Sequence, residues 1–289
     1  EDLVAAEMLF AAGAKLDPVI IEAPNMVLNA IKYNRIKSLQ WLFDHHVDLD
    51  LKTEDGFSIL WKTVGNWTFF DFLLDHGIDP RFNELLDEKL AGVRSALLEK
   101  KEGRERLKRI AGPELKKIVF AGDNEVDRYR EIRNFVRRGD LDGLRFAYDL
   151  GFEVNSRGAR GNSLLHTAIL YKKLDVVKQL IEWGADADAK NDSGEAPIQY
   201  AINYKANDIF NYLAETGVSL DSREKFSGAG LLHLAAKRPL SEKVFVKLFS
   251  RGFKVNDLDK NGATPLLFSV EHGCEETVDY LLQAGADPN

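Results

Sequence analysis

The apolar residues of segment 161–189 fall into two short helical patterns separated by a polar turn. Ser163 precedes the first pattern, and its hydroxyl can cap a helix N-terminus. The second pattern repeats apolar residues at i, i+1, i+4 and i+5, as one helix stripe does: Val176, Val177, Leu180 and Ile181. Gly184 then stands where a left-handed residue commonly ends a helix. Neither helix can bury its apolar face alone, so the pattern predicts stacking on neighbouring units.

This unit recurs along the chain with a nearly constant period. Its marker is a glycine that follows the second helix, with an aspartate or asparagine shortly after it. The markers are Gly13, Gly77, Gly151, Gly184, Gly217, Gly252 and Gly285, with His46 in the slot between the first two. Successive gaps are 33, 31, 74, 33, 33, 35 and 33 residues. A period of this length is typical of a helical solenoid.

Several segments carry a resemblance to a known family. They are Asn261–Leu267 and Tyr280–Asn289, together with the signature-like runs Leu164–Ala168, Ala196–Ala201 and Leu231–Ala235. These resemble the ankyrin repeat and its T-P-L-H-x-A signature, over about 245 of the 289 residues. The resemblance implies an all-α ankyrin-repeat solenoid of stacked helix-turn-helix units. Met26–Leu28 and Ile59–Trp61 depart from the signature, which puts the turn geometry of those repeats in doubt.

The 74-residue gap contains a helical insertion. Apolar spacing predicts one amphipathic helix from Phe82 to Leu97, a break at Gly103 and a second helix around Leu107. Pro113 is expected to start a third. We therefore expect N-terminal repeats in 1–80 (a half repeat plus two), an insertion or degenerate repeat in 81–123, and five repeats in 124–289. One continuous solenoid is favoured over two stacks joined by a helical linker, because the apolar residues of the insertion need neighbours to cover them.

Charge is distributed unevenly. Residues 94–138 hold 14 Lys or Arg against 8 Asp or Glu, a net of +6, so the remainder carries −13 to give the total of −7. Two interpretations are open: a solvated helix surface with Glu–Lys pairs, or a basic docking patch. The residues of the second interpretation are Arg104, Arg106, Lys108 and Arg109.

Catalytic chemistry is not indicated. His166 and His233 occupy the signature slot and are expected to be structural, while His272 and Cys274 form the one close Cys/His pair. A single cysteine excludes an internal disulfide and a thiolate zinc site. No glycine-rich phosphate loop follows a strand. We expect neither enzyme activity nor a cofactor nor a metal, and no apolar run reaches the roughly 18 residues that cross a membrane.

The equivalent positions before each inter-helix turn are the first candidates for partner contact. Tyrosine recurs there, and the positions hold Tyr33, Leu170 with Tyr171, Tyr204, and Arg238. Such aromatic and arginine side chains are frequent anchors of interfaces. The turn tips add Phe57, Arg157, Arg160 and Phe226.

These features favour a protein-binding module that masks or inhibits a partner through its concave face. The divergent repeats are similar to those of bacterial ankyrin proteins of the immunity or inhibitor type. An effector or adaptor that tethers a cellular protein is the alternative; nucleic-acid binding through the insertion ranks below both, because a pI near 5.5 opposes phosphate attraction. We expect a monomer when free. The compartment stays open, cytoplasmic by default, since both ends look trimmed and a periplasmic or secreted protein is also compatible.

Overall fold

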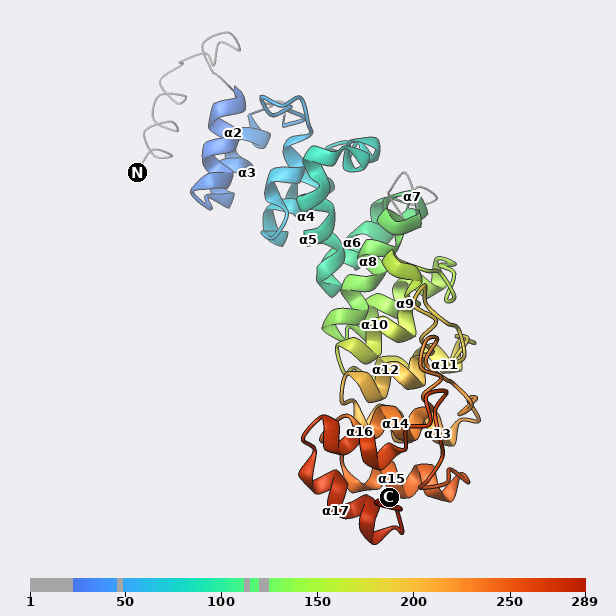
Figure 1. Ribbon diagram of the computed structural model, residues 1–289. Helices are drawn as coiled ribbons and strands as arrows, with labels where there is room; N and C mark the ends of the chain where they lie inside the picture. The colour runs from blue at the N-terminus through green and yellow to red at the C-terminus, as the bar shows by residue number, and fades with distance from the viewer. Residues whose placement is uncertain (1–22, 46–48, 112–114, 120–124) are drawn as a thin grey trace. The chain divides into compact units, whose positions relative to one another are not determined.

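The chain divides into two compact units in the computed structural model, which describes residues 23–45, 49–111, 115–119 and 125–289. Unit 1 is Glu1–Val119 and unit 2 is Phe120–Asn289 (Figure 1). Within the described ranges the regular elements are 16 α-helices and four short 3-10 helices, with no strand. The predicted all-α fold is confirmed. The markers Gly13 and His46, and Pro113, lie outside the described residues.

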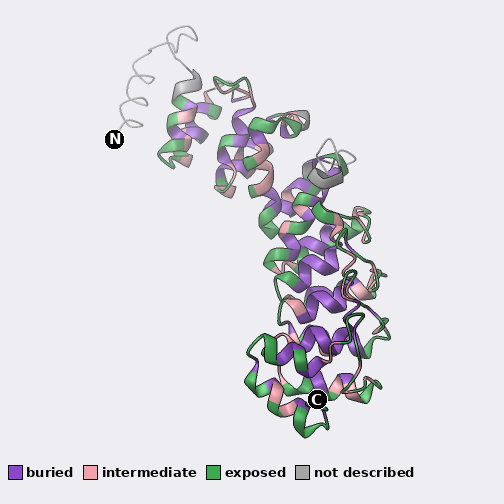
Figure 2. Cartoon of the chain, viewed as in Figure 1, coloured by how far each residue is buried: buried purple, intermediate pink, exposed green. Residues whose placement is uncertain are grey.

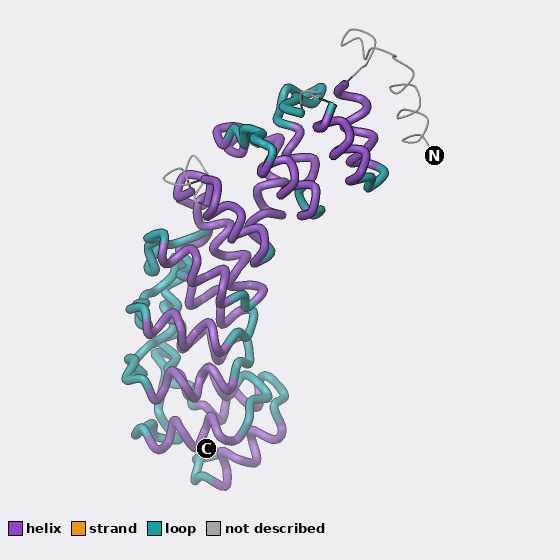
Figure 3. The backbone as a smooth tube through the Cα atoms, turned by 180° about the vertical axis from the view of Figure 1, so that it is seen from behind, coloured by secondary structure: helices purple, strands orange, loops and turns teal. Residues whose placement is uncertain are grey.

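Unit 2 is built from two rows of helices. The inner helices contact one another in succession: α8 (Glu125–Arg138), α10 (Leu164–Leu170), α12 (Pro197–Asn203), α14 (Leu231–Ala236) and α16 (Pro265–Glu271). Each packs against the outer helix that follows it: α9 (Leu141–Asp149), α11 (Leu174–Glu182), α13 (Asn207–Glu215), α15 (Glu242–Ser250) and α17 (Glu275–Gln283). Figure 3 shows these pairs as successive layers joined by loops.

Burial follows the predicted apolar stripes. Val177 and Leu180 of α11 are fully buried, as are Leu164 and Leu165 of α10. The Ser163 hydroxyl caps α10 by accepting from the His166 N–H, and the Thr264 hydroxyl accepts from the Leu267 N–H in α16. Buried residues lie on the helices of unit 2 while its loops are mostly exposed or half-buried (Figure 2). Stacking of neighbouring repeats therefore supplies the core.

The loops that join successive repeats, here called fingers, are tied together by one recurring bond. A side-chain oxygen of one finger accepts a backbone N–H of the next, about 31 residues further along the chain. The pairs are Asn155 Oδ1 with Asp186 N (2.8 Å), Asp188 Oδ1 with Ser219 N (2.9 Å) and Asn256 Oδ1 with Asp287 N (2.9 Å). This bond holds each finger on the next one, although a finger has no apolar core of its own.

His166 and His233 connect inner helices to fingers. His166 Nδ1 accepts from the Ser163 N–H (3.2 Å), and His166 Nε2 donates to the Glu195 carbonyl (2.9 Å). His233 Nε2 donates to the Ala263 carbonyl (3.1 Å). Burial lowers the pKa of both imidazoles, so the neutral form is favoured. The structural role predicted for both is confirmed.

Unit 1 is less regular. It contains α2 (Ala23–Lys32), α3 (Ile36–Asp44), η1 (Ile59–Thr63), α4 (Trp67–Asp75), η2 (Phe82–Leu86), η3 (Glu88–Leu90), α5 (Ala91–Glu99), α6 (Lys101–Ala111) and α7 (Leu115–Val119). The segment Ile59–Thr63, which lacks the family signature, forms a 3-10 helix in place of an inner α-helix.

Two predictions about the insertion are wrong. Residues 82–90 form two 3-10 helices, so the amphipathic helix begins at Ala91 and not at Phe82. The break lies at Lys100, which is extended, while α6 runs through Gly103 without interruption. A Cβ on Gly103 would lie 2.2 Å from the Leu97 carbonyl oxygen. Gly103 therefore permits the close crossing of α6 over the end of α5 and does not end a helix.

Candidate functional site

The ends of the inner helices form a row of cationic and aromatic side chains in unit 2. We call it the cap row: Arg138, Tyr171, Tyr204, Arg238 and His272. Tyr171, Tyr204 and His272 are the C-caps of α10, α12 and α16. Adjacent helix ends lie side by side, since Arg238 Nη2 donates to Asn203 Oδ1 at 3.3 Å. The cap row carries no acidic residue.

Tyr171 and Tyr204 differ in the contacts that they make within their own repeats. Tyr171 is 42% exposed and Tyr204 is 40% exposed. The Tyr204 ring packs 4.7 Å from the ring of Tyr200, measured between centroids. Burial, together with a hydrogen bond to Tyr204, raises the pKa of Tyr200 to about 12. Tyr204 thus has a packing role besides its exposed surface, whereas Leu170 and Tyr171 offer exposed area directly.

Tyr33 is the corresponding residue of unit 1. It follows α2 and is 58% exposed. Two cations lie over its ring, with the Lys32 ammonium 5.4 Å and the Arg35 guanidinium 5.8 Å from the centroid. The structure therefore brings two of the three predicted tyrosines into the cap row of unit 2 and places the third in unit 1.

The predicted finger residues have separate roles. Phe226 is 86% exposed, with the Lys225 ammonium 6.0 Å from its ring centroid. Arg157 Nη1 donates to the Lys190 carbonyl (2.9 Å), and the Arg160 carbonyl accepts from the Asp192 N–H (3.1 Å). Both arginines thus help to join one finger to the next. Phe226 is the finger residue with the largest free apolar surface.

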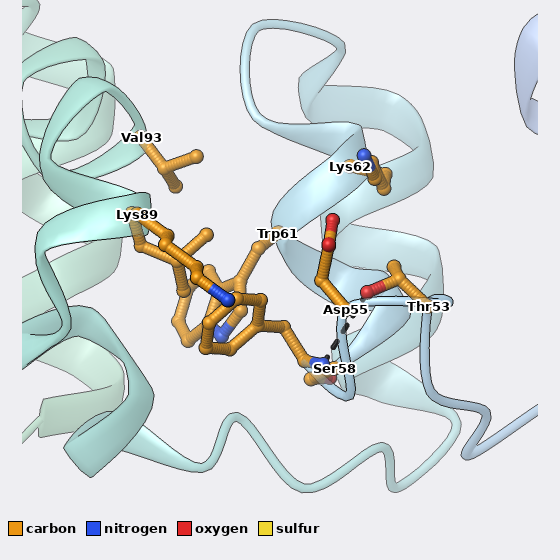
Figure 4. Close-up of a pocket in the computed structure, with 9 residues that line it drawn as sticks. Thr53, Asp55, Ser58, Trp61, Lys62, Lys89 and Val93 are labelled. Atoms are coloured by element: carbon orange, nitrogen blue, oxygen red, sulfur yellow. Dashed lines mark hydrogen bonds between the residues drawn. The ribbon is translucent and has the colours of Figure 1, made fainter.

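Phe57 lies against a small cavity in unit 1. The cavity measures about 160 Å³ and is lined by Thr53, Asp55, Phe57, Ser58, Trp61, Lys62, Lys89, Leu90 and Val93 (Figure 4). The Phe57 N–H donates to Thr53 Oγ1 (3.3 Å). Glu84 Oε2 accepts from the Ser58 N–H (2.7 Å) and from Trp61 Nε1 (3.0 Å). Phe57 is half-buried beside this cavity, which has room for a single side chain and is smaller than a cofactor site.

The basic residues of α6 are engaged within unit 1. Arg104 is only 4% exposed and Nη1 donates to the carbonyls of Leu98 (2.7 Å) and Glu99 (3.1 Å). Arg104 therefore contributes no charge to an exposed patch, because its guanidinium completes the C-terminus of α5.

The other three predicted patch residues, Arg106, Lys108 and Arg109, are paired with carboxylates. Arg106 donates from Nε and Nη2 to the two carboxylate oxygens of Asp71, and its guanidinium lies 4.7 Å from the Trp67 ring centroid. Arg109 pairs with Asp75 (3.0 Å) and Lys108 with Glu105 (3.1 Å). This geometry favours the ion-paired helix surface over a free docking patch.

Sequence reasoning missed four cations next to the cap row. Arg137 precedes Arg138, and Lys173 closes the turn after α10. Lys172 and Lys205 hold left-handed backbone, both with φ of 53°. The corresponding turn residues elsewhere in unit 2 are Gly139 and Gly273. Alignment on the left-handed turn, in place of the helix signature, would have found these lysines.

The repeats of unit 2 also match a known family. The sequence profile of a family described as "Ankyrin repeats (3 copies)" matches residues 134–224 and 217–289, together more than half of the chain. The chain belongs to the ankyrin-repeat family. A comparison with curated proteins gave no match. The fingers and paired helices of unit 2 are those of ankyrin repeats, whose shared role is protein binding.

Two further features bear on chemistry. Across the described ranges, no cluster of three or more His, Cys, Asp or Glu side chains is arranged to hold a metal ion. No helix in the described part of the chain has the length and apolar character needed to cross a bilayer. Cys274 is a buried free thiol, with Sγ 3.8 Å from the His272 carbonyl oxygen.

Proposed function

We propose that this ankyrin-repeat protein is a non-catalytic module that binds one partner protein through the concave, inner-helix side of unit 2. The observation that carries the proposal is the exposure of Tyr171 and Tyr204 at one equivalent position of successive repeats. An exposed tyrosine combines a large apolar surface with a hydroxyl, which suits protein contacts. Because the position lies at the helix end, repetition of tyrosine there is explained better by contact than by stability of the repeat.

Site-specific photo-crosslinking tests the proposed face. A photoreactive phenylalanine replaces Tyr171 in one variant and Val246 in the control. Val246 is also exposed and apolar but lies on the outer helix α15. We expect a defined protein to be crosslinked in the source cells from position 171 and not from position 246. Equal crosslinking from both positions would contradict the proposed face.

Affinity measurements then quantify the contact. With the crosslinked partner purified, Tyr171→Ala should weaken binding by at least about 1 kcal/mol, roughly fivefold in Kd, as measured by calorimetry. Val246→Ala serves as the matched control and should bind like the wild type. Tyr204→Ala is less clean, because the Tyr204 ring also packs on Tyr200.

The consequence of binding separates the two forms of this function. We propose masking or inhibition of the partner, as in ankyrin proteins of the bacterial immunity or inhibitor type, and tethering by an effector or adaptor is the alternative. The activity of the partner should fall as it is titrated with the chain. Unchanged activity in a saturated complex would support tethering. Binding of nucleic acid by α6 is disfavoured by the pairing of Arg106 and Arg109 with Asp71 and Asp75.

A further inference from the structure

A line of cations follows the inter-helix turns of four successive repeats in unit 2. We call it the turn ridge: Arg137, Arg138, Lys172, Lys205, Lys237 and Arg238. The first four side chains are exposed and the last two are half-buried. The turns they occupy are neighbours, since the Lys173 side chain lies 3.3 Å from where a Cβ on Gly139 would stand. The ridge therefore forms one edge of the inner-helix side.

Two of these lysines stand where the backbone favours another residue. Lys172 and Lys205 have φ of 53°, in the left-handed region. Gly139 and Gly273 fill the corresponding positions in two other repeats of unit 2. Glycine adopts this conformation without a steric penalty, whereas lysine does not. Stability alone would favour glycine, so the side chains of Lys172 and Lys205 point to a use of their charge.

The cations of the ridge differ in their partners. Among the described residues, Arg137, Lys172 and Lys205 make no ion pair, whereas Lys237 lies 3.8 Å from Glu224. The acids nearest in sequence to the exposed ridge cations, Asp140, Asp175 and Asp208, lie at the starts of the outer helices. Exposed cations without a partner can form new charge-assisted contacts at little desolvation cost.

The spacing of the ridge selects a class of ligand. Neighbouring helices pack about 8–10 Å apart, and an extended chain in the polyproline II conformation advances about 3.1 Å per residue with three residues per turn. Each repeat therefore corresponds to about three residues of an extended segment. We propose that the turn ridge binds an extended, acidic segment of a partner protein, with carboxylates at i, i+3, i+6 and i+9. Side chains between these carboxylates would contact the rings of Tyr171 and Tyr204.

The ridge ends within unit 2, at the fourth of its repeats. In the last repeat Glu271, Gly273 and Glu275 surround His272, so no fixed cation continues the line beyond Arg238. Four repeats then accommodate about ten residues.

A nucleic acid would present its phosphates continuously, and these would also meet Asp175 and Asp208 beside the turns. A peptide with spaced carboxylates avoids that conflict.

The test uses a labelled ten-residue peptide with glutamate at positions 1, 4, 7 and 10 and small apolar residues between. Its binding to the intact chain is followed by fluorescence anisotropy at low and high salt. We expect the peptide to bind at least tenfold more tightly than one of the same composition with four contiguous glutamates. Equal binding of the two peptides, or tighter binding of single-stranded DNA, would overturn the proposed ligand class.

The decisive variant is Lys172→Gly with Lys205→Gly, because glycine fits the left-handed turns. Its melting temperature should stay at or above the wild-type value, while peptide affinity falls at least tenfold. Lys178→Ala with Lys243→Ala removes two exposed lysines from outer helices and is the charge-matched control, which should bind the peptide as the wild type does. Unchanged affinity in the glycine variant would refute the proposal.

This inference rests on the proposed function, and the two can fail separately. If the crosslinked partner loses affinity with Tyr171→Ala but binds the glycine variant normally, the face is correct and the acidic segment is wrong. If the partner is insensitive to Tyr171→Ala, the proposed face itself is wrong.

Discussion

The hydrogen bonds that join neighbouring segments are made differently in the two units. In unit 2 the same finger bond recurs from repeat to repeat, as between Asn155 and Asp186. In unit 1 individual charged side chains make these hydrogen bonds. Arg94 donates to the Leu85 carbonyl (2.6 Å), Arg104 donates to the end of α5, and Glu84 accepts from the start of η1.

This difference affects how well each unit tolerates amino-acid substitution. A bond made by a repeated turn serves any number of repeats, and neighbouring copies support it. A bond made by one buried charge serves one place and has no substitute. The family profile matches residues 134–289, which lie within unit 2. Regular spacing, more than any single residue, is what makes those repeats recognisable.

The largest effect should come from a cavity between repeats of unit 2. Leu180 is fully buried in α11, so Leu180→Ala removes apolar contacts and should lower the free energy of unfolding by about 2–5 kcal/mol. Urea denaturation followed by far-UV circular dichroism measures it. Val246→Ala, on the exposed side of α15, should change stability by no more than about 0.5 kcal/mol. A similar loss in both variants would mean that stability does not reside in the stacked core.

A smaller loss, confined to unit 1, should follow when its buried guanidinium is removed. Arg104→Met leaves the Leu98 and Glu99 carbonyls without their donor and should cost roughly 1.5–3 kcal/mol. Three of the four tryptophans, Trp41, Trp61 and Trp67, lie in unit 1, so tryptophan fluorescence mainly follows its unfolding. Arg109→Met breaks an exposed pair and should cost about 0–1 kcal/mol. If the two variants unfold alike, the assignment of Arg104 as a helix-end donor is wrong.

The smallest effect concerns pH. Burial lowers the pKa of His166 in the folded state below its unfolded value near 6.5. The unfolded chain therefore binds more protons as the pH falls below about 6.5, and folding stability is lost toward the folded pKa. Above that pH the contribution is constant.

His166→Gln should flatten this dependence while keeping the cap. Gln199 already occupies the equivalent position and accepts from the Ala196 N–H at 2.8 Å. Thermal melts of both proteins between pH 7.5 and 5 provide the measurement, with Gln199→His as the converse variant. An identical pH dependence in wild type and His166→Gln would exclude His166 as its source.

Much of the fold and part of the candidate site could be predicted from the sequence. The apolar stripe of α11 and the cap at Ser163 depend on local spacing and on one nearby hydroxyl, and both predictions are confirmed. Tyr171 and Tyr204 were found because they follow the helix signature directly. Lys172 and Lys205 were not, because their significance lies in a left-handed backbone conformation that only an alignment with the turn residues Gly139 and Gly273 brings out.

The sequence by itself determined the repeat, its helices and the family, because these depend on contacts between residues a few positions apart. Only the tertiary structure decided where the helices of the basic insertion break and which of its charges are exposed. Gly103 appeared to be a helix break and Arg104 a surface charge, yet α6 passes so close to α5 that only glycine fits and the guanidinium is enclosed. That proximity depends on how two helices cross, and packing, unlike helix periodicity, is not written in the spacing of one segment.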